Sequence, residues 1–267
     1  MYTFEQQGDS LNVTYRCDQK WYQNLAQGVF GGIARAGQAI NVEVPSQYAG
    51  LLDARTTNAS VTADSLPKLT ECRLATTNGS LRAADITANT FILSTTNASV
   101  HLDRLQGAAL FVTSTNGSMH LADLSMTGEL TARTTNAGVQ VDRVEAADGQ
   151  IHTTNGSLAL RNGKFSGSLN AGTTNGPIKT DAVEALTAEL TSKSGSVRLE
   201  NSRFAERVSV RTTNASIRVE QLASKDIRLS STNGSIKGAI AGRQQDYSIV
   251  TNTTNGSASP LSVVDRQ

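Results

Sequence analysis

Two of the three histidines, His101 and His120, are the first residues whose type and spacing suggest chemistry. Each stands four residues after the asparagine of a repeated phrase. On neighbouring coils of a repetitive fold they would lie about one strand spacing apart (~4.8 Å) and could share a metal ion. The row of equivalent positions reads Thr62, Arg82, His101, His120, Gln140, Ala159, Lys179, Arg198, Arg218 and Lys237. Because a metal site requires further ligands and supporting residues, we favour surface histidines and predict no metal and no cofactor. His152 belongs to a different row.

Carboxylates two residues beyond that row are the next candidates: Asp64, Asp103, Asp142, Asp181, Glu200 and Glu220. Paired carboxylates suit a glycosidase, and with nearby Arg or Lys a polysaccharide lyase. Adjacent rows of opposite charge also form weak surface pairs in a stacked fold, and no coil has a denser cluster than its neighbours. We therefore predict no catalytic residues. The chain also contains no nucleotide-binding, hydrolase-elbow, zinc-protease or calcium-loop motif.

The repeated phrase, written "TTNASV" at residues 56–61 and 95–100, indicates the architecture. Its asparagine recurs every 19–20 residues, with one final gap of 22 and with Ser194 in place of one asparagine. The positions are Asn58, Asn78, Asn97, Asn116, Asn136, Asn155, Asn175, Asn214, Asn233 and Asn255. A fixed period of this kind is typical of a solenoid.

Apolar and polar residues alternate on both sides of the asparagine, which is the strand period. The predicted fold class is all-β: a single-stranded parallel β-solenoid (β-helix) of about eleven coils, forming a rod of roughly 50 Å. We expect a right-handed coil, since parallel crossovers are almost always right-handed. A propeller blade needs about forty residues, twice this period.

Counting alternately through the corner places the first Thr or Ser and the asparagine inward, and the second Thr outward. We therefore expect an internal asparagine ladder that bonds between coils and to turn backbone. Inward asparagines would make the N-x-[ST] matches accidental as glycosylation sites. Outward Thr and Ser rows could bind ice, a reading we disfavour because solenoids form such rows without selection for a ligand.

The ends of the chain differ from the repeats. Residues 1–50 hold most of the aromatic residues and are expected to form an N-terminal β cap packed on the solenoid, with strands in "SLNVTYRC" and "INVEVP" and a loop or short helix between them. Residues 51–260 form the solenoid, and residues 261–267 a tail. Cys17 and Cys72 fit unpaired buried thiols better than a disulfide.

The 24 basic and 23 acidic residues nearly cancel, which argues against nucleic acid as a partner. No stretch approaches the ~20 apolar residues of a membrane span, and the start lacks a signal peptide.

A phrase of the form S/T-x-N/S-G-x-[IV] every 19–20 residues, preceded by "INVEVPSQY" at residues 40–48, resembles a bacterial adhesin family of unknown function. That family is related to the auto-transporter adhesin head (GIN) domain. The resemblance covers residues from about 9 to 260. It implies a β-strand repeat fold, an envelope or extracellular location and no catalytic residues; without a signal peptide, a cytoplasmic location stays open.

These observations favour a non-enzymatic binding or scaffold module that uses the solenoid wall as its contact surface. The candidate contact row is Arg82, His101, His120, Lys179, Arg198, Arg218 and Lys237, and the candidate partner is an anionic glycan, an envelope polymer or another protein. The alternatives are a β-helix polysaccharide lyase or hydrolase, and a self-assembling structural rod.

Overall fold

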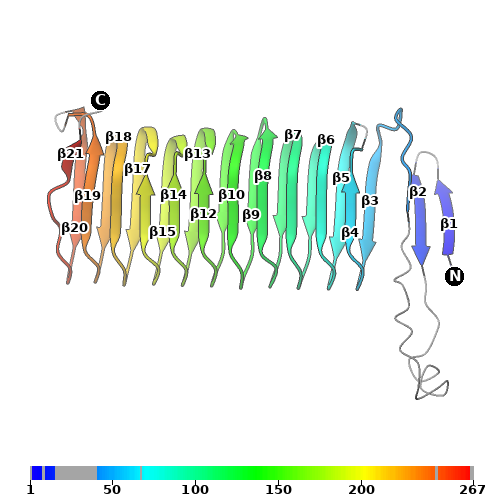
Figure 1. Cartoon of the computed structure of the whole chain (residues 1–267), viewed down its shortest axis with the longest axis horizontal. Helices are drawn as coiled ribbons and strands as arrows, with labels where there is room; N and C mark the ends of the chain where they lie inside the picture. The colour runs from blue at the N-terminus through cyan, green and yellow to red at the C-terminus, as the bar shows by residue number, and fades with distance from the viewer. Residues whose placement is uncertain (1, 8–9, 16–40, 67, 244–245, 265–267) are drawn as a thin grey trace, which may run out of the picture.

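The computed structural model describes residues 2–7, 10–15, 41–66, 68–243 and 246–264. Figure 1 shows a long rod of parallel strands, each coil stacked on the one before. The predicted all-β parallel solenoid of about eleven coils is confirmed. Separately, β1 (Tyr2–Gln7) and β2 (Ser10–Tyr15) pair as an antiparallel hairpin.

The solenoid strands form one continuous sheet of parallel neighbours. They are β3 (Leu51–Thr56), β4 (Val61–Asp64), β5 (Leu69–Thr76), β6 (Leu81–Ser94), β7 (Val100–Thr113), β8 (Met119–Met126), β9 (Glu129–Arg133), β10 (Val139–Ala146), β11 (Asp148–His152), β12 (Leu158–Arg161), β13 (Lys164–Thr173), β14 (Ile178–Asp181), β15 (Glu184–Ser192), β16 (Val197–Glu200), β17 (Arg203–Thr212), β18 (Ile217–Ser231), β19 (Ile236–Ala241), β20 (Ser248–Thr253) and β21 (Ser262–Val264).

Each coil contains three straight segments separated by corners. In the pair β6–β7, residues 81–84, 86–88 and 90–94 align with 100–103, 105–107 and 109–113. The gaps fall at Asp85 and Asn89, and the repeated phrase closes the coil. This register places equivalent residues of successive repeats directly above one another, so side chains form rows along the rod.

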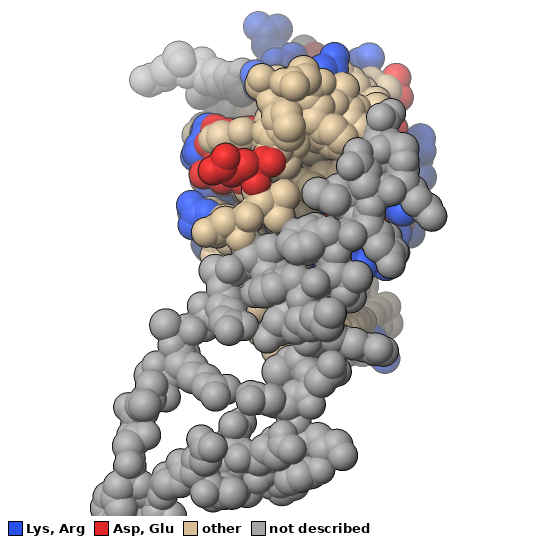
Figure 2. Space-filling model, turned by 90° about the vertical axis from the view of Figure 1, so that its right-hand side faces the viewer, with Lys and Arg blue, Asp and Glu red and all other residues tan. Residues whose placement is uncertain are grey.

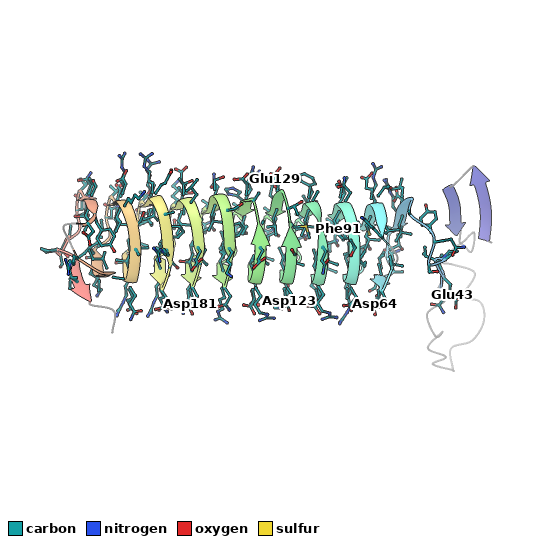
Figure 3. The ribbon with its side chains drawn as sticks, turned by 90° about the horizontal axis from the view of Figure 1, so that it is seen from above. Glu43, Asp64, Phe91, Asp123, Glu129 and Asp181 are labelled. Atoms are coloured by element: carbon teal, nitrogen blue, oxygen red, sulfur yellow. The ribbon has the colours of Figure 1, made fainter. Side chains whose placement is uncertain are left out.

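The core is one continuous apolar column inside the coils. The position three residues after each asparagine is buried from Leu81 through to Ile236 and supplies one of its rows. Phe91 and Phe204 are the largest fully buried side chains. In Figure 3, Phe91 lies between the two long sides of the rod. A fully buried aliphatic or aromatic side chain contributes ~1.5–3 kcal/mol, so stability is distributed along the whole column.

The ends differ from the expected boundaries. Residues 41–45 of "INVEVP" are not in a strand, and Val42 is 53% exposed. The alternating pattern indicates which side chains would share a face, but a strand also requires a neighbouring strand to pair with. At the other end the sheet passes residue 260, because β21 pairs with β19 and Leu261 is buried. Ile40, Cys17 and the expected loop or helix of residues 19–39 lie outside the described residues.

Candidate functional site

The candidate contact row runs along the wall formed by β4, β6, β7, β8, β10, β12, β14, β16, β18 and β19. Its members are Cα partners in one unbroken register from Thr62 to Lys237. Arg82, His101, His120, Arg198, Arg218 and Lys237 are exposed, and Lys179 is half-buried. Except at Ala159, the wall therefore presents one polar side chain per coil at the strand spacing, ~4.8 Å.

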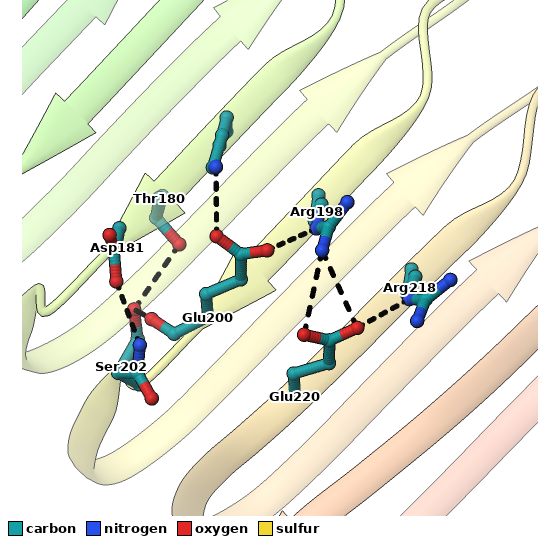
Figure 4. A network of polar contacts seen from close by, with 9 residues as sticks. Thr180, Asp181, Arg198, Glu200, Ser202, Arg218 and Glu220 are labelled. Atoms are coloured by element: carbon teal, nitrogen blue, oxygen red, sulfur yellow. Dashed lines mark hydrogen bonds and ion pairs between the residues drawn. The ribbon is translucent and has the colours of Figure 1, made fainter.

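Acidic neighbours neutralise part of this row (Figure 4). Glu200 binds Lys179 at 2.9 Å and also pairs with Arg198. Glu220 binds Arg218 at 2.6 Å and lies 3.5 Å from Arg198. The hydrogen bond from Lys179 holds the pKa of Glu200 below its ordinary value, and the bond from Arg218 does the same for Glu220. By contrast, Arg82 and Lys237 form no ion pair with any described residue.

A second row, polar except for Ala182, lies at the next corner and was not identified from the sequence. It consists of nine non-glycine residues in the left-handed region, with φ between 49° and 54°: Ser65, Asp85, Arg104, Asp123, Arg143, Asn162, Ala182, Asn201 and Gln221. Its signal in the sequence was a fixed position enriched in Asp and Asn, which tolerate that conformation.

Ion pairs join this corner row from coil to coil. Arg104 reaches back to Asp85 with two bonds, at 2.6 and 2.7 Å, and also pairs with Asp103. Arg143 repeats the arrangement two coils later, with Asp123 and Asp142. The Arg104 and Arg143 guanidinium groups lower the pKa of Asp85 and Asp123. Figure 3 shows Asp64, Asp123 and Asp181 along this side of the rod, opposite Glu129. Asp123 pairs with Arg143, whereas Asp64 and Asp181 accept hydrogen bonds from Ser65 and Asn201.

The asparagines of the repeated phrase are hydrogen bonded along the rod but lie on its outside. Each Nδ2 donates to Oδ1 of the preceding asparagine at 2.6–2.8 Å, from Asn58 to Asn175 and again from Asn214 to Asn255. The prediction that they face inward is wrong. All ten are exposed: Asn58, Asn78, Asn97, Asn116, Asn136, Asn155, Asn175, Asn214, Asn233 and Asn255. The argument against glycosylation, which rested on inward asparagines, fails with it.

The inward group at this corner is the hydroxyl two residues earlier. Thr76 Oγ1 accepts from the Gly79 N–H at 3.1 Å and donates to the Ala59 carbonyl at 3.0 Å. Thr153, Thr173, Ser192 and Ser231 make the same pair of bonds. The strand alternation therefore stops at this hydroxyl, because the next two residues both point outward. The hydroxyl performs the turn bonding that the sequence analysis assigned to the asparagine.

One aliphatic and one aromatic side chain are exposed on another face of the rod. Ile92 of β6 and Phe111 of β7 are Cα partners, 40% and 36% exposed. Viewed along the rod from its N-terminal end, charged side chains lie around the rim of the described coils (Figure 2). Charged side chains therefore share the surface with a few exposed large apolar side chains.

The histidines and Cys72 are the remaining candidate groups. The rings of His101 and His120 are 6.2 Å apart, and half-buried His152 lies elsewhere, its pKa lowered by burial and by Arg133. Among the described residues, no three His, Cys, Asp or Glu side chains converge on a metal position. Cys72 is a free, buried thiol whose pKa burial raises to about 12. The described part of the chain includes no helix with the length and hydropathy of a membrane crossing.

Neither the curated proteins nor the solved structures compared with this chain include a match. A family model does match, over residues 2–187 and again over residues 166–260. Two overlapping matches are natural for a repeat fold, because the same model can be placed on different coils. Together they span the hairpin strands and nearly all of the solenoid. The chain thus belongs to the Toastrack DUF4097 family.

Proposed function

We propose that this chain is a non-enzymatic binding or scaffold module that contacts a repetitive anionic polymer along its solenoid wall. The observation that supports the proposal is the unbroken register of the row from Thr62 to Lys237. A polymer with regularly spaced charges can repeat one weak contact coil after coil, so that modest interactions add up. Envelope location and adhesin-like use form part of the proposal through the resemblance of the repeat phrase.

The charge distribution favours the C-terminal third of the rod. Residues 191–243 hold ten Lys or Arg and four Asp or Glu, whereas residues 41–190 hold ten and fourteen. The rod is therefore electrically polar, although the net charge of the whole chain is only +1. Within the positive third the row supplies Arg198, Arg218 and Lys237. Glu200 and Glu220 hold Arg198 and Arg218 in place, and the guanidinium N–H groups that these pairs leave unused can bind an anionic group.

Binding of alginate, a polyuronate, is the direct test, with neutral dextran as the comparison polymer. The variant Arg198→Glu/Arg218→Glu/Lys237→Glu should lose at least tenfold in alginate affinity, and wild-type binding should weaken with salt. The matched control, Lys193→Glu/Arg203→Glu/Lys225→Glu, makes the same charge change in the same third of the rod but away from the row.

Equal losses of alginate affinity in the two triple variants would mean that binding depends only on the overall positive charge of this third of the rod. That result would refute the row as the contact surface. Analysis of alginate after incubation tests the non-enzymatic part of the proposal: release of unsaturated or shortened products would identify an enzyme instead.

A further inference from the structure

We propose that His101 and His120 form a two-histidine chelate for a divalent transition metal ion, with Gln140 as its orienting residue. The inference is independent of polymer binding. It rests on three features of adjacent coils: register, ring separation and the hydrogen bond that fixes one imidazole.

Register brings the two imidazoles together. His101 of β7 and His120 of β8 are Cα partners on parallel strands, and both are exposed on the same wall. Their side chains therefore leave the backbone in the same direction, about one strand spacing apart.

The ring separation is compatible with one shared ion. A metal–nitrogen distance of about 2.0 Å places the centroids of two coordinating imidazoles roughly 4.5 Å apart for ligands at a right angle and roughly 6.4 Å apart for opposed ligands. The observed 6.2 Å lies within that interval. Both rings are exposed, so small χ rotations can reach the intermediate angles without moving the backbone.

Gln140 completes the arrangement from the next coil. It is the Cα partner of His120, and its Oε1 lies 3.3 Å from His120 Nδ1. An amide oxygen only accepts, so the tautomer that makes this hydrogen bond carries its proton on Nδ1 and leaves the lone pair on Nε2 for a metal. Metal-binding histidines usually have such a partner on the second nitrogen. The remaining coordination positions would face solvent, open to water or to a donor from another molecule.

Cu²⁺ is the appropriate probe, because imidazole sites bind it most tightly among the first-row divalent ions. The titration uses the full chain with Cys17→Ser, so that this thiol does not reduce the ion. We expect one Cu²⁺ per chain and two imidazole nitrogens in the electron paramagnetic resonance spectrum. His101→Ala and His120→Ala should each raise Kd on the order of tenfold or more and leave one nitrogen. Gln140→Ala should raise Kd by up to about tenfold while keeping both nitrogens.

His152→Ala, which removes the third histidine away from this wall, is the matched control and should leave the spectrum and Kd unchanged. Circular dichroism verifies that the exposed substitutions preserve the fold. A wild-type spectrum with a single nitrogen overturns the proposal, as does an unchanged Kd and stoichiometry in the His101→Ala/His120→Ala variant.

Discussion

Substitution of Gly117 by alanine should destabilise the solenoid far more than a glycine-to-alanine change normally does. Gly117 follows Asn116 in the repeated phrase, and a Cβ added there would lie 1.7 Å from the carbonyl oxygen of Ala98 in the preceding coil. That carbonyl is backbone, so relief requires adjacent coils to separate. The same conflict, at 1.7–2.2 Å from the corner carbonyl oxygen of the preceding coil, recurs whether that coil has alanine or glycine: at Gly79, Gly156, Gly176, Gly195, Gly234 and Gly256.

Glycine or alanine stands at this corner position in all eleven coils. The corner position reads Ala59, Gly79, Ala98, Gly117, Ala137, Gly156, Gly176, Gly195, Ala215, Gly234 and Gly256. Alanine never occupies two successive coils. Where glycine occurs here it serves close approach of backbone to backbone and not a left-handed turn, since none of these corner glycines has a positive φ.

The magnitude follows from the contact. Overpacking usually costs 1–3 kcal/mol, and a backbone obstacle at this distance places Gly117→Ala at the upper end, about 3 kcal/mol. For a domain of this size each 1 kcal/mol lowers Tm by about 2–4 °C, so we expect a decrease of about 6–12 °C. Ala137→Gly, in the next coil, is the matched control: it creates no clash and should cost only about 0.5–1 kcal/mol in chain entropy.

Thermal unfolding followed by circular dichroism at 218 nm measures both variants. If Gly117→Ala melts within about 2 °C of the wild type, or no lower than Ala137→Gly, the coils separate easily and the steric reasoning is refuted.

Three further predictions follow from the polar rows and the core. Ser194→Asn should fill the gap in the asparagine ladder between Asn175 and Asn214. Two new exposed hydrogen bonds, at about 0.5 kcal/mol each, should raise Tm by about 2–4 °C. The control Ser196→Asn lies off the ladder and should leave Tm unchanged, so equal melting of the two variants would contradict a stabilising ladder. Acid should destabilise the rod, because Arg104 lowers the pKa of Asp85 in the folded state. The contribution of this ion pair to stability is present above the ordinary pKa of 3.8 and is lost as the pH falls through the folded pKa. Arg104→Gln should therefore flatten the dependence of Tm on pH below pH 4, and an unchanged slope would contradict the role of the pair. Cys72 should resist iodoacetamide at pH 8 in the folded Cys17→Ser chain and react in urea, because burial raises its pKa to about 12 and blocks access of the reagent. Mass spectrometry measures the labelling, and rapid labelling of the folded chain would contradict the buried position of this thiol.

The sequence by itself determined the period, the strand character and the buried rows. Alternation around each asparagine identifies Leu81, Val100 and Met119 as interior residues, and the structure buries all three. It also placed His101 beside His120, because a constant period leaves only one register for parallel coils.

Only the tertiary structure decided what happens at the corners. Alternation is a property of extended backbone and gives no information through a turn. It placed Thr76 inward and Thr77 outward correctly, but it could not show that Asn78 also points outward. The same reason explains the missed left-handed row: Arg104 and Arg143 read as ordinary polar residues until the stacked coils bring Asp85 and Asp123 within hydrogen-bonding distance. Interior burial follows from local periodicity, whereas corner contacts depend on the distance between coils, which exists only once the chain has folded.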